Sequence, residues 1–131
     1  MTIKNNRYIL AFGNPFIEGD TLALDLAEYF QKNPISHHEF IKCITPDEII
    51  QYTDKEFFIL DVAKGIKEIT IITNPDQLEA NNLVSLHDFD LGFFLKLAKE
   101  MDKLSSINII CLPMDINIKI AIEKIKEILK K

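Results

Sequence analysis

The stretch FFILDVAKGIKEITIIT, residues 57–73, decides the fold. Its first part, FFILDVA, is a continuous apolar run that carries an acid near its end, as is typical of a central strand covered on both faces. Only KGIK separates this run from EITIIT, which also has the pattern of a strand. Because a parallel crossover needs about a dozen residues or more, the strand at 68–73 is predicted to lie antiparallel to at least part of the sheet.

Three further segments have the short apolar pattern of strands, and four have features of helices. The strands are RYILAF (7–12), HEFIKCI (38–44) and INIICLP (107–113). The predicted helices are residues 20–32, TPDEIIQY (45–52), FDLGFFLKLAKEMDKL (89–104) and the closing DINIKIAIEKIKEILKK. The first helix is expected to end at Asn33, because a residue before proline is pushed out of the helical region.

The resulting order, β-α-β-α-β-β-α-β-α, predicts an α/β fold. Alternating strands and helices are typical of a three-layer α/β/α sandwich. We therefore expect one domain over residues 1–131, with a mixed sheet of five strands, mostly parallel, and one antiparallel strand. Residues 74–87 mix turn formers with scattered apolar residues, so they predict a loop with a short strand.

The composition bounds the class of protein. The hydrophobic fraction is 47% and the charged fraction 27%, near the averages of soluble globular proteins. No apolar run approaches the roughly 20 residues that span a bilayer, and the N-terminus lacks a signal-peptide pattern, so we expect a cytoplasmic protein with no membrane partner. The net charge is -5 and the basic residues are scattered until the last helix, which argues against a nucleic-acid partner.

The two cysteines, Cys43 and Cys111, are predicted to be buried free thiols. Each lies inside an apolar strand-like segment, and together they lack the CxxC spacing of a zinc or redox site. A free cysteine in such a segment behaves as a small apolar side chain.

Three residues that can carry chemistry are expected at one edge of the sheet: Asp20, Asp61 and His87. In open α/β sheets ligands bind outside the carboxyl ends of the strands. Two carboxylates and an imidazole there form a candidate site for a divalent metal. Each residue also has a simpler interpretation: Asp20 as a helix cap, Asp61 as an acid satisfied by backbone N–H groups, and His87 as a structural histidine in a loop.

Other polar residues near the same motifs have weaker interpretations. Glu18 is a spare ligand or surface charge, and Asp88 either caps the following helix or orients His87. His37 and His38 are expected in a solvated turn at the far end of the sheet. The loop GNPFIEGD lacks the G-x-G-x-x-G spacing of a dinucleotide site, and no serine or cysteine is paired with a histidine as a nucleophile would be.

Three segments resemble the signatures of the [NiFe]-hydrogenase maturation endopeptidases, in the family's order. The family's opening strand, followed by G-N-x-(L)-x-x-D-(D/E)-G-x-G and a helix, is similar to ILAFGNPFIEGDTLALDLAEYF. Its second signature, an apolar strand ending in Asp, is similar to FFILDVA. Its third signature, S-x-H-D-(L)-x-L followed by a leucine-rich helix, is similar to SLHDFDLGFFLKLA. The resemblance implies the phosphorylase/hydrolase-like sandwich with one antiparallel strand. It covers nearly the whole chain.

The same resemblance implies a function. Family members remove a C-terminal extension from a hydrogenase large-subunit precursor once nickel is in place. By position the metal-recognising and catalytic residues become Asp20, Asp61 and His87, with Asn14 shaping the loop and Asp88 in support. The nickel belongs to the substrate, so no permanently bound cofactor is implied, although Cd²⁺ or Zn²⁺ can occupy such a site. A monomer or weak oligomer is expected.

The chain departs from the family pattern where Asp-(Asp/Glu)-Gly-x-Gly is usual. It reads Gly19-Asp20-Thr21-Leu22-Ala23 instead, so the first acid and both following glycines are missing. Missing glycines narrow the backbone freedom of the turn. The alternative function is therefore a non-catalytic relative that binds metal or a partner as an assembly factor, and a nucleotide-binding α/β domain is a third.

Overall fold

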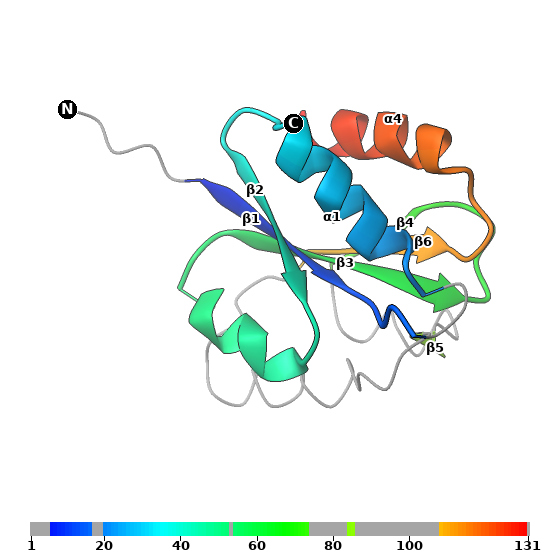
Figure 1. The fold of residues 1–131 in the computed structure, drawn as a ribbon, viewed down its shortest axis with the longest axis horizontal. Helices are drawn as coiled ribbons and strands as arrows, with labels where there is room; N and C mark the ends of the chain where they lie inside the picture. The colour runs from blue at the N-terminus through cyan, green and yellow to red at the C-terminus, as the bar shows by residue number, and fades with distance from the viewer. Residues whose placement is uncertain (1–5, 17–19, 53, 74–83, 86–107, 131) are drawn as a thin grey trace.

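The computed structural model describes residues 6–16, 20–52, 54–73, 84–85 and 108–130, which form a mixed sheet flanked by helices (Figure 1). The strands are β1 (Arg7–Phe12), β2 (His38–Cys43), β3 (Phe57–Lys64), β4 (Thr70–Ile72), β5 (Val84–Ser85) and β6 (Asn108–Pro113). The helices are α1 (Leu22–Lys32), the 3₁₀ helix η1 (Pro46–Tyr52) and α4 (Ile118–Leu129).

The main path of the sheet has five strands, in the order β2-β1-β3-β6-β4. β2, β1, β3 and β6 are parallel to one another, whereas β4 pairs antiparallel with β6. The predicted fold class is confirmed, including the antiparallel strand that the short KGIK connection requires. A sixth strand of two residues, β5, lies within the segment predicted as a loop with a short strand and pairs antiparallel with the end of β3.

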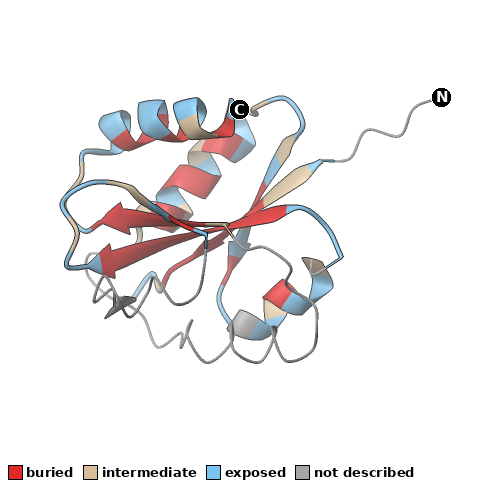
Figure 2. Cartoon of the chain, turned by 180° about the vertical axis from the view of Figure 1, so that it is seen from behind, coloured by how far each residue is buried: buried red, intermediate tan, exposed pale blue. Residues whose placement is uncertain are grey.

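The two faces of the sheet carry separate apolar cores, because successive side chains of a strand point to opposite faces. Phe58, Leu60 and Val62 of β3 belong to the core beneath α1 and α4. Phe57 and Ile59 belong to the second core, which includes Ile49 of η1. Buried residues accordingly make up most of β1, β3 and β6 and lie on the inner sides of the helices, as Figure 2 shows.

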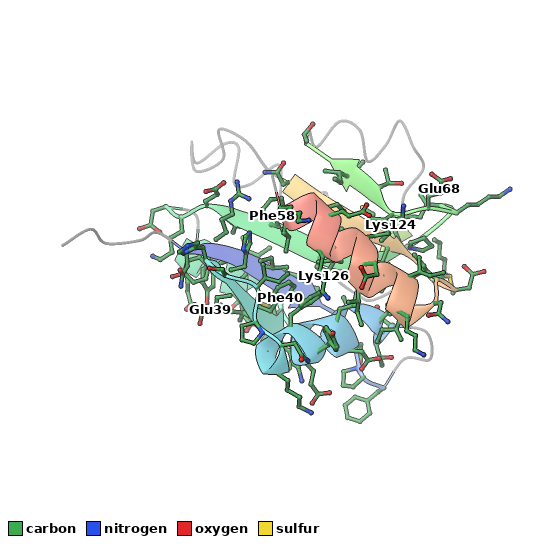
Figure 3. All side chains as sticks on the ribbon, turned by 90° about the horizontal axis from the view of Figure 1, so that it is seen from above. Glu39, Phe40, Phe58, Glu68, Lys124 and Lys126 are labelled. Carbon is green, nitrogen blue, oxygen red and sulfur yellow. The ribbon has the colours of Figure 1, made fainter. Side chains whose placement is uncertain are left out.

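Aromatic side chains anchor the helices to their core. Phe30 of α1 stacks on Phe40 of β2, with ring centroids 4.7 Å apart. Phe40 and Phe58 lie beneath the helical layer, while Lys124 and Lys126 of α4 lie on its exposed side (Figure 3). Burying aromatic rings contributes strongly to core stability, so the contact between Phe30 and Phe40 helps to hold α1 on this face.

The helix boundaries follow from local capping. α1 begins at Leu22, two residues later than predicted, with Thr21 at its N-cap position, and it ends at Asn33 as predicted. α4 begins after Asn117, whose side chain accepts a hydrogen bond of 2.8 Å from the N–H of Lys119. A side-chain acceptor at the N-cap satisfies a donor that the helix leaves open.

The segment predicted as a short helix at 45–52 is a 3₁₀ helix. Glu48 Oε2 accepts hydrogen bonds from the N–H groups of Ile44 and Thr45, at 2.6 and 2.9 Å. The N–H of Glu48 in turn donates to the carbonyl of Thr45, three residues back, which is the 3₁₀ pattern. The helix predicted at 89–104 lies outside the described residues.

Candidate functional site at the carboxyl edge of the sheet

The candidate site lies at the edge of the sheet where β1 ends and its neighbour β3 continues. Ala11 lies opposite Leu60, so Phe12, the last residue of β1, lies level with Asp61. β3 runs on for three more residues beyond Asp61. There β5 pairs with Ala63 and Lys64. Asp61 is thus located at the carboxyl end of the β1–β3 pair, and in open α/β sheets ligands bind outside the carboxyl ends of the strands.

Asp61 is a buried acid, with 2% of its surface exposed. Its Oδ1 accepts a hydrogen bond of 2.9 Å from the N–H of Val62. The alternation of β3 directs its side chain to the same face as Phe57 and Ile59, away from α1 and α4. Burying a carboxylate costs free energy unless its oxygens accept hydrogen bonds. The bond from Val62 supplies one such donor and offsets part of this cost.

Asp20 is also buried, with none of its surface exposed. It lies between β1 and α1, outside the helix, because Thr21 occupies the N-cap position. Its Oδ2 accepts a hydrogen bond of 2.8 Å from the N–H of Asn14. The carboxylate therefore binds the backbone of the loop that leaves β1, six residues earlier in the chain.

Gly13 makes this arrangement possible through close backbone approach. A Cβ placed on Gly13 would lie 2.5 Å from the carbonyl oxygen of Asp20 and 3.1 Å from the side chain of Leu24. The first distance is shorter than real Cβ atoms tolerate, and the oxygen belongs to the backbone. Glycine at this position lets the start of the loop pack against the residue that carries the acid.

Asn14 connects the buried acid to the exposed end of the same loop. Its N–H donates to Asp20, and its side-chain Oδ1 accepts a hydrogen bond of 2.9 Å from the N–H of Phe16. Such a bond between an Asn side chain and the backbone two residues on defines an Asx turn. The position of Phe16 is therefore coupled to that of Asp20 through one residue.

Cys111 is a neighbour of the site that the sequence motifs did not indicate. It lies opposite Asp61 on β6 and is buried. Burial, together with the negative charge of Asp61, raises the pKa of the Cys111 thiol from 9.0 to about 12. Cys111 and Cys43 are both buried free cysteines, as predicted. The thiol beside Asp61 is consequently neutral at physiological pH.

The other predicted site residues fall into two groups. Glu18, His87 and Asp88 lie outside the described residues, and within the described ranges no three His, Cys, Asp or Glu side chains form a group able to hold a metal ion. His37 and His38 lie at the opposite end of the sheet, where the carbonyl of His37 accepts from the N–H of Arg7 at the start of β1.

The chemistry of the described site is that of two buried carboxylates on one edge. Asp20 follows β1 and Asp61 lies in the adjacent strand β3. Carboxylate oxygens suit divalent cations, and a bound cation offsets the cost of removing a carboxylate from water. Asp61 also has a buried thiol beside it, a softer donor type.

Solved structures with the same fold are hydrogenase maturation proteases. HybD from Thermococcus kodakarensis superposes with a TM-score of 0.69 at 19% identity, over 95% of this chain and 97% of its own. A hydrogenase 3 maturation protease superposes with a TM-score of 0.70 at 21% identity, over 94% and 88%. HybD from E. coli gives a TM-score of 0.67 at 11% identity, over 95% and 92%.

These likenesses show that the chain has the α/β fold of hydrogenase maturation proteases over nearly its full length. Neither a protein-family profile nor a curated protein sequence matches the chain. The likeness in fold is therefore seen in the arrangement of helices and strands, and not in sequence identity. No helix within the described ranges has the length and apolar character needed to traverse a membrane.

Proposed function

We propose that this protein is a divergent [NiFe]-hydrogenase maturation endopeptidase, which removes a C-terminal extension from a nickel-loaded hydrogenase large-subunit precursor. The observation that carries the proposal is the pair of buried acids, Asp20 and Asp61, at the carboxyl edge of a sheet whose fold is shared with maturation proteases. The three sequence signatures resemble the same family and supply these two acids in its order.

In this proposal Asp20, Asp61 and His87 recognise the nickel that the precursor carries. Two features support it. Asp20 and Asp61 belong to a loop and a strand at the same edge, and β5 runs antiparallel to β3, from the level of Lys64 toward that of Asp61. His87 follows the last residue of β5 by two positions in the sequence. Asp88 supports the imidazole.

The roles of the residues follow from their chemistry. Two carboxylates and an imidazole are suitable ligands for a divalent first-row metal. A carbonyl or water polarised by the precursor's nickel then provides the route to peptide hydrolysis. Asn14 holds Asp20 by its backbone N–H, so the acid is positioned before the substrate arrives.

Cleavage of the precursor tests the proposal directly. The protein is incubated with a purified nickel-loaded large-subunit precursor, and loss of the C-terminal extension is followed by mass spectrometry. We expect wild-type protein to cleave, and Asp61→Asn to reduce the rate by about 100-fold or more, since a metal-recognising carboxylate is lost. Asp54→Asn is the matched control, because the Asp54 side chain is 79% exposed and lies outside the proposed site.

Two results would contradict this function. One is an intact precursor after incubation with folded wild-type protein and nickel. The other is cleavage by Asp61→Asn at the wild-type rate. Equal losses in Asp61→Asn and Asp54→Asn would show that removal of any negative charge matters, which also counts against a specific site.

The second candidate function is a non-catalytic assembly factor that binds the precursor without cutting it. The altered Gly19-Asp20-Thr21-Leu22-Ala23 sequence favours this alternative, because the family's usual glycines are missing there. It predicts that the precursor co-purifies with the protein and keeps its extension. Nickel-loaded precursor in the same cleavage assay separates the two functions.

The proposal also includes cellular and cofactor properties. The protein acts in the cytoplasm, holds no permanent cofactor and works as a monomer or weak oligomer. Isothermal titration with Ni²⁺, Cd²⁺ and Mg²⁺ measures what the free site binds, and titration with ATP tests the nucleotide-binding alternative. A ligand that binds only the folded state also raises the melting temperature, which provides an independent readout.

A further inference from the structure

Three exposed apolar side chains follow the carboxyl ends of parallel strands. Within the described ranges the large hydrophobic residues with exposed side chains are Phe16, Ile44, Ile50, Ile71, Met114, Ile118 and Ile120. Three of them follow directly or closely after parallel strands. Ile44 follows β2, Phe16 lies four residues beyond β1, and Met114 follows β6. We name Phe16, Ile44 and Met114 the apolar rim.

The rim lies around the buried acids. In the order β2-β1-β3-β6, its members follow β2, β1 and β6, while Asp61 lies in β3 between the last two. These four strands are parallel to one another, so their carboxyl ends belong to one edge of the sheet, and the ends of β3 and β6 are seen at the right of Figure 1. Three strand spacings separate β2 from β6, which is about 14 Å. A small molecule is too short to contact the whole rim, whereas an extended polypeptide spans it.

Phe16 is the most exposed member, at 93%, with Ile44 at 73% and Met114 at 44%. Exposed single apolar residues are ordinary on protein surfaces. Phe16 differs because its N–H is bonded to Asn14 Oδ1, while the N–H of Asn14 is bonded to Asp20. These bonds fix the backbone that carries Phe16 relative to the buried acid.

The size of the rim distinguishes between possible occupants. At the exposures given, the three side chains present roughly 400 Å² at most, since a large side chain offers on the order of 150–200 Å². A stable dimer buries about 800 Å² on each partner. The rim is too small for a second copy of this chain and has the size of a transient contact.

From these observations we propose that the apolar rim, with Phe16 as its main contact, binds an extended apolar segment of the protein substrate while the substrate's metal centre meets Asp20 and Asp61. This inference rests on the proposed function for the identity of the substrate. It adds a specificity-determining residue that is separate from the acids. Phe16 contributes to affinity for the substrate and takes no part in the chemical step.

Binding and cleavage are measured separately to test the inference. The dissociation constant of the purified nickel-loaded precursor is determined by isothermal titration for wild type, Phe16→Ala, Phe16→Leu and Ile50→Ala, and KM and kcat are measured for the same proteins. We expect Phe16→Ala to weaken binding about 10-fold, as is typical when a central aromatic contact is removed. KM should rise accordingly with kcat nearly unchanged, and Phe16→Leu should restore most of the affinity.

Ile50→Ala is the matched control, because Ile50 is 54% exposed but belongs to η1 rather than to the rim. Its affinity should stay within about twofold of wild type. All variants replace exposed side chains, so their melting temperatures should match that of the wild type.

Failure of the inference and failure of the proposed function give different results. Precursor binding that depends on Phe16 without any cleavage would support the rim and contradict the peptidase. Cleavage with an unchanged KM in Phe16→Ala would overturn the rim and leave the peptidase standing. Equal weakening by Ile50→Ala, no precursor binding by wild type, or loss of a wild-type dimer in Phe16→Ala would each overturn the inference.

Discussion

Charged side chains are partly exposed at the amino end of the parallel strands and buried at the carboxyl end. At the amino end, Arg7 and Glu56 form an ion pair of 3.0 Å with side chains 29% and 59% exposed, and the Arg7 guanidinium lies 5.8 Å from the centre of the Phe58 ring. At the carboxyl end, Asp20 and Asp61 have at most 2% of their surface exposed. The amino end thus has an ion pair in contact with solvent, whereas the carboxyl end has two carboxylates shielded from it.

The two ends therefore differ in the free-energy cost of their charged groups. An exposed ion pair costs little to form and contributes little to stability. A buried carboxylate costs free energy that packing alone does not repay, so its retention points to a role in binding. The same edge also buries Cys43 and Cys111, which makes it the end where titratable groups are shielded from solvent.

The largest effect on stability is expected when a side chain is added at Gly13, where the backbone packs closely against that of Asp20. In Gly13→Ala the new Cβ meets the carbonyl oxygen of Asp20, so the loop must shift. We expect the free energy of unfolding, measured by urea denaturation, to fall by about 1–3 kcal/mol. Cleavage should also be lost because Asp20 moves with the loop.

Asn14→Ala provides the control for this change. It keeps the backbone N–H that donates to Asp20 and removes only the acceptor for the N–H of Phe16. Its loss of stability should be about 1 kcal/mol or less. A Gly13→Ala protein as stable as wild type would show that the edge is not tightly packed there, and the comparison of the two ends would lose its structural basis.

A smaller effect is expected at the amino end. A double-mutant cycle with Arg7→Gln and Glu56→Gln should give a coupling energy of about 0.2–1 kcal/mol, because both side chains are partly exposed. The coupling should decrease further in about 1 M salt, which screens exposed charges. A coupling of several kcal/mol that is insensitive to salt would mean that this end also stabilises charge in a buried environment.

The smallest effect at neutral pH is that of Cys43. Burial, and then the negative charge of Glu48, raises the pKa of its thiol from 9.0 to about 12, and the neighbouring Tyr52 also has a raised pKa because of burial and then Cys43. The unfolded chain therefore loses the thiol proton first as the pH rises. Stability from this group is complete below about pH 9 and is lost as the pH rises toward 12.

Urea denaturation of wild type and Cys43→Ala at a series of alkaline pH values measures this contribution. Wild type should lose stability between pH 9 and 12 more steeply than Cys43→Ala, because the variant has no thiol at this position. Parallel curves for the two proteins would show that the Cys43 thiol ionises equally in the folded and unfolded states.

The architecture could be predicted from sequence where burial pattern and connection length are both restrictive. The apolar run at 57–63 predicts a central strand, and the four residues of KGIK exclude a parallel crossover, so the antiparallel β4 follows. The 3₁₀ form of η1 could not be predicted in the same way. Its backbone hydrogen bond runs from the N–H of Glu48 to the carbonyl of Thr45, three residues back, and the helical pattern of the eight residues 45–52 does not distinguish this geometry from an α-helix.

For the site, sequence indicated the acids but not their surroundings. Asp61 follows a buried apolar run, so its burial could be expected. Its position level with Phe12 and opposite Cys111 depends on the register of three strands, which is a property of tertiary pairing. The choice for Asp20 between helix cap and loop acid likewise required the hydrogen bond to Asn14, since both roles use the same residue type beside a helix.

The hydrogen bond between Asn14 and Asp20 closes the intervening backbone into a ring. Five residues lie between them in the sequence, and Gly13 leaves no room for the ring to shift toward α1. Side chains within the ring can vary without changing its circumference, whereas one inserted or deleted residue moves the carboxylate away from the sheet. Among natural variants of this chain, the loop should therefore keep its length, and it should keep an apolar side chain at Phe16.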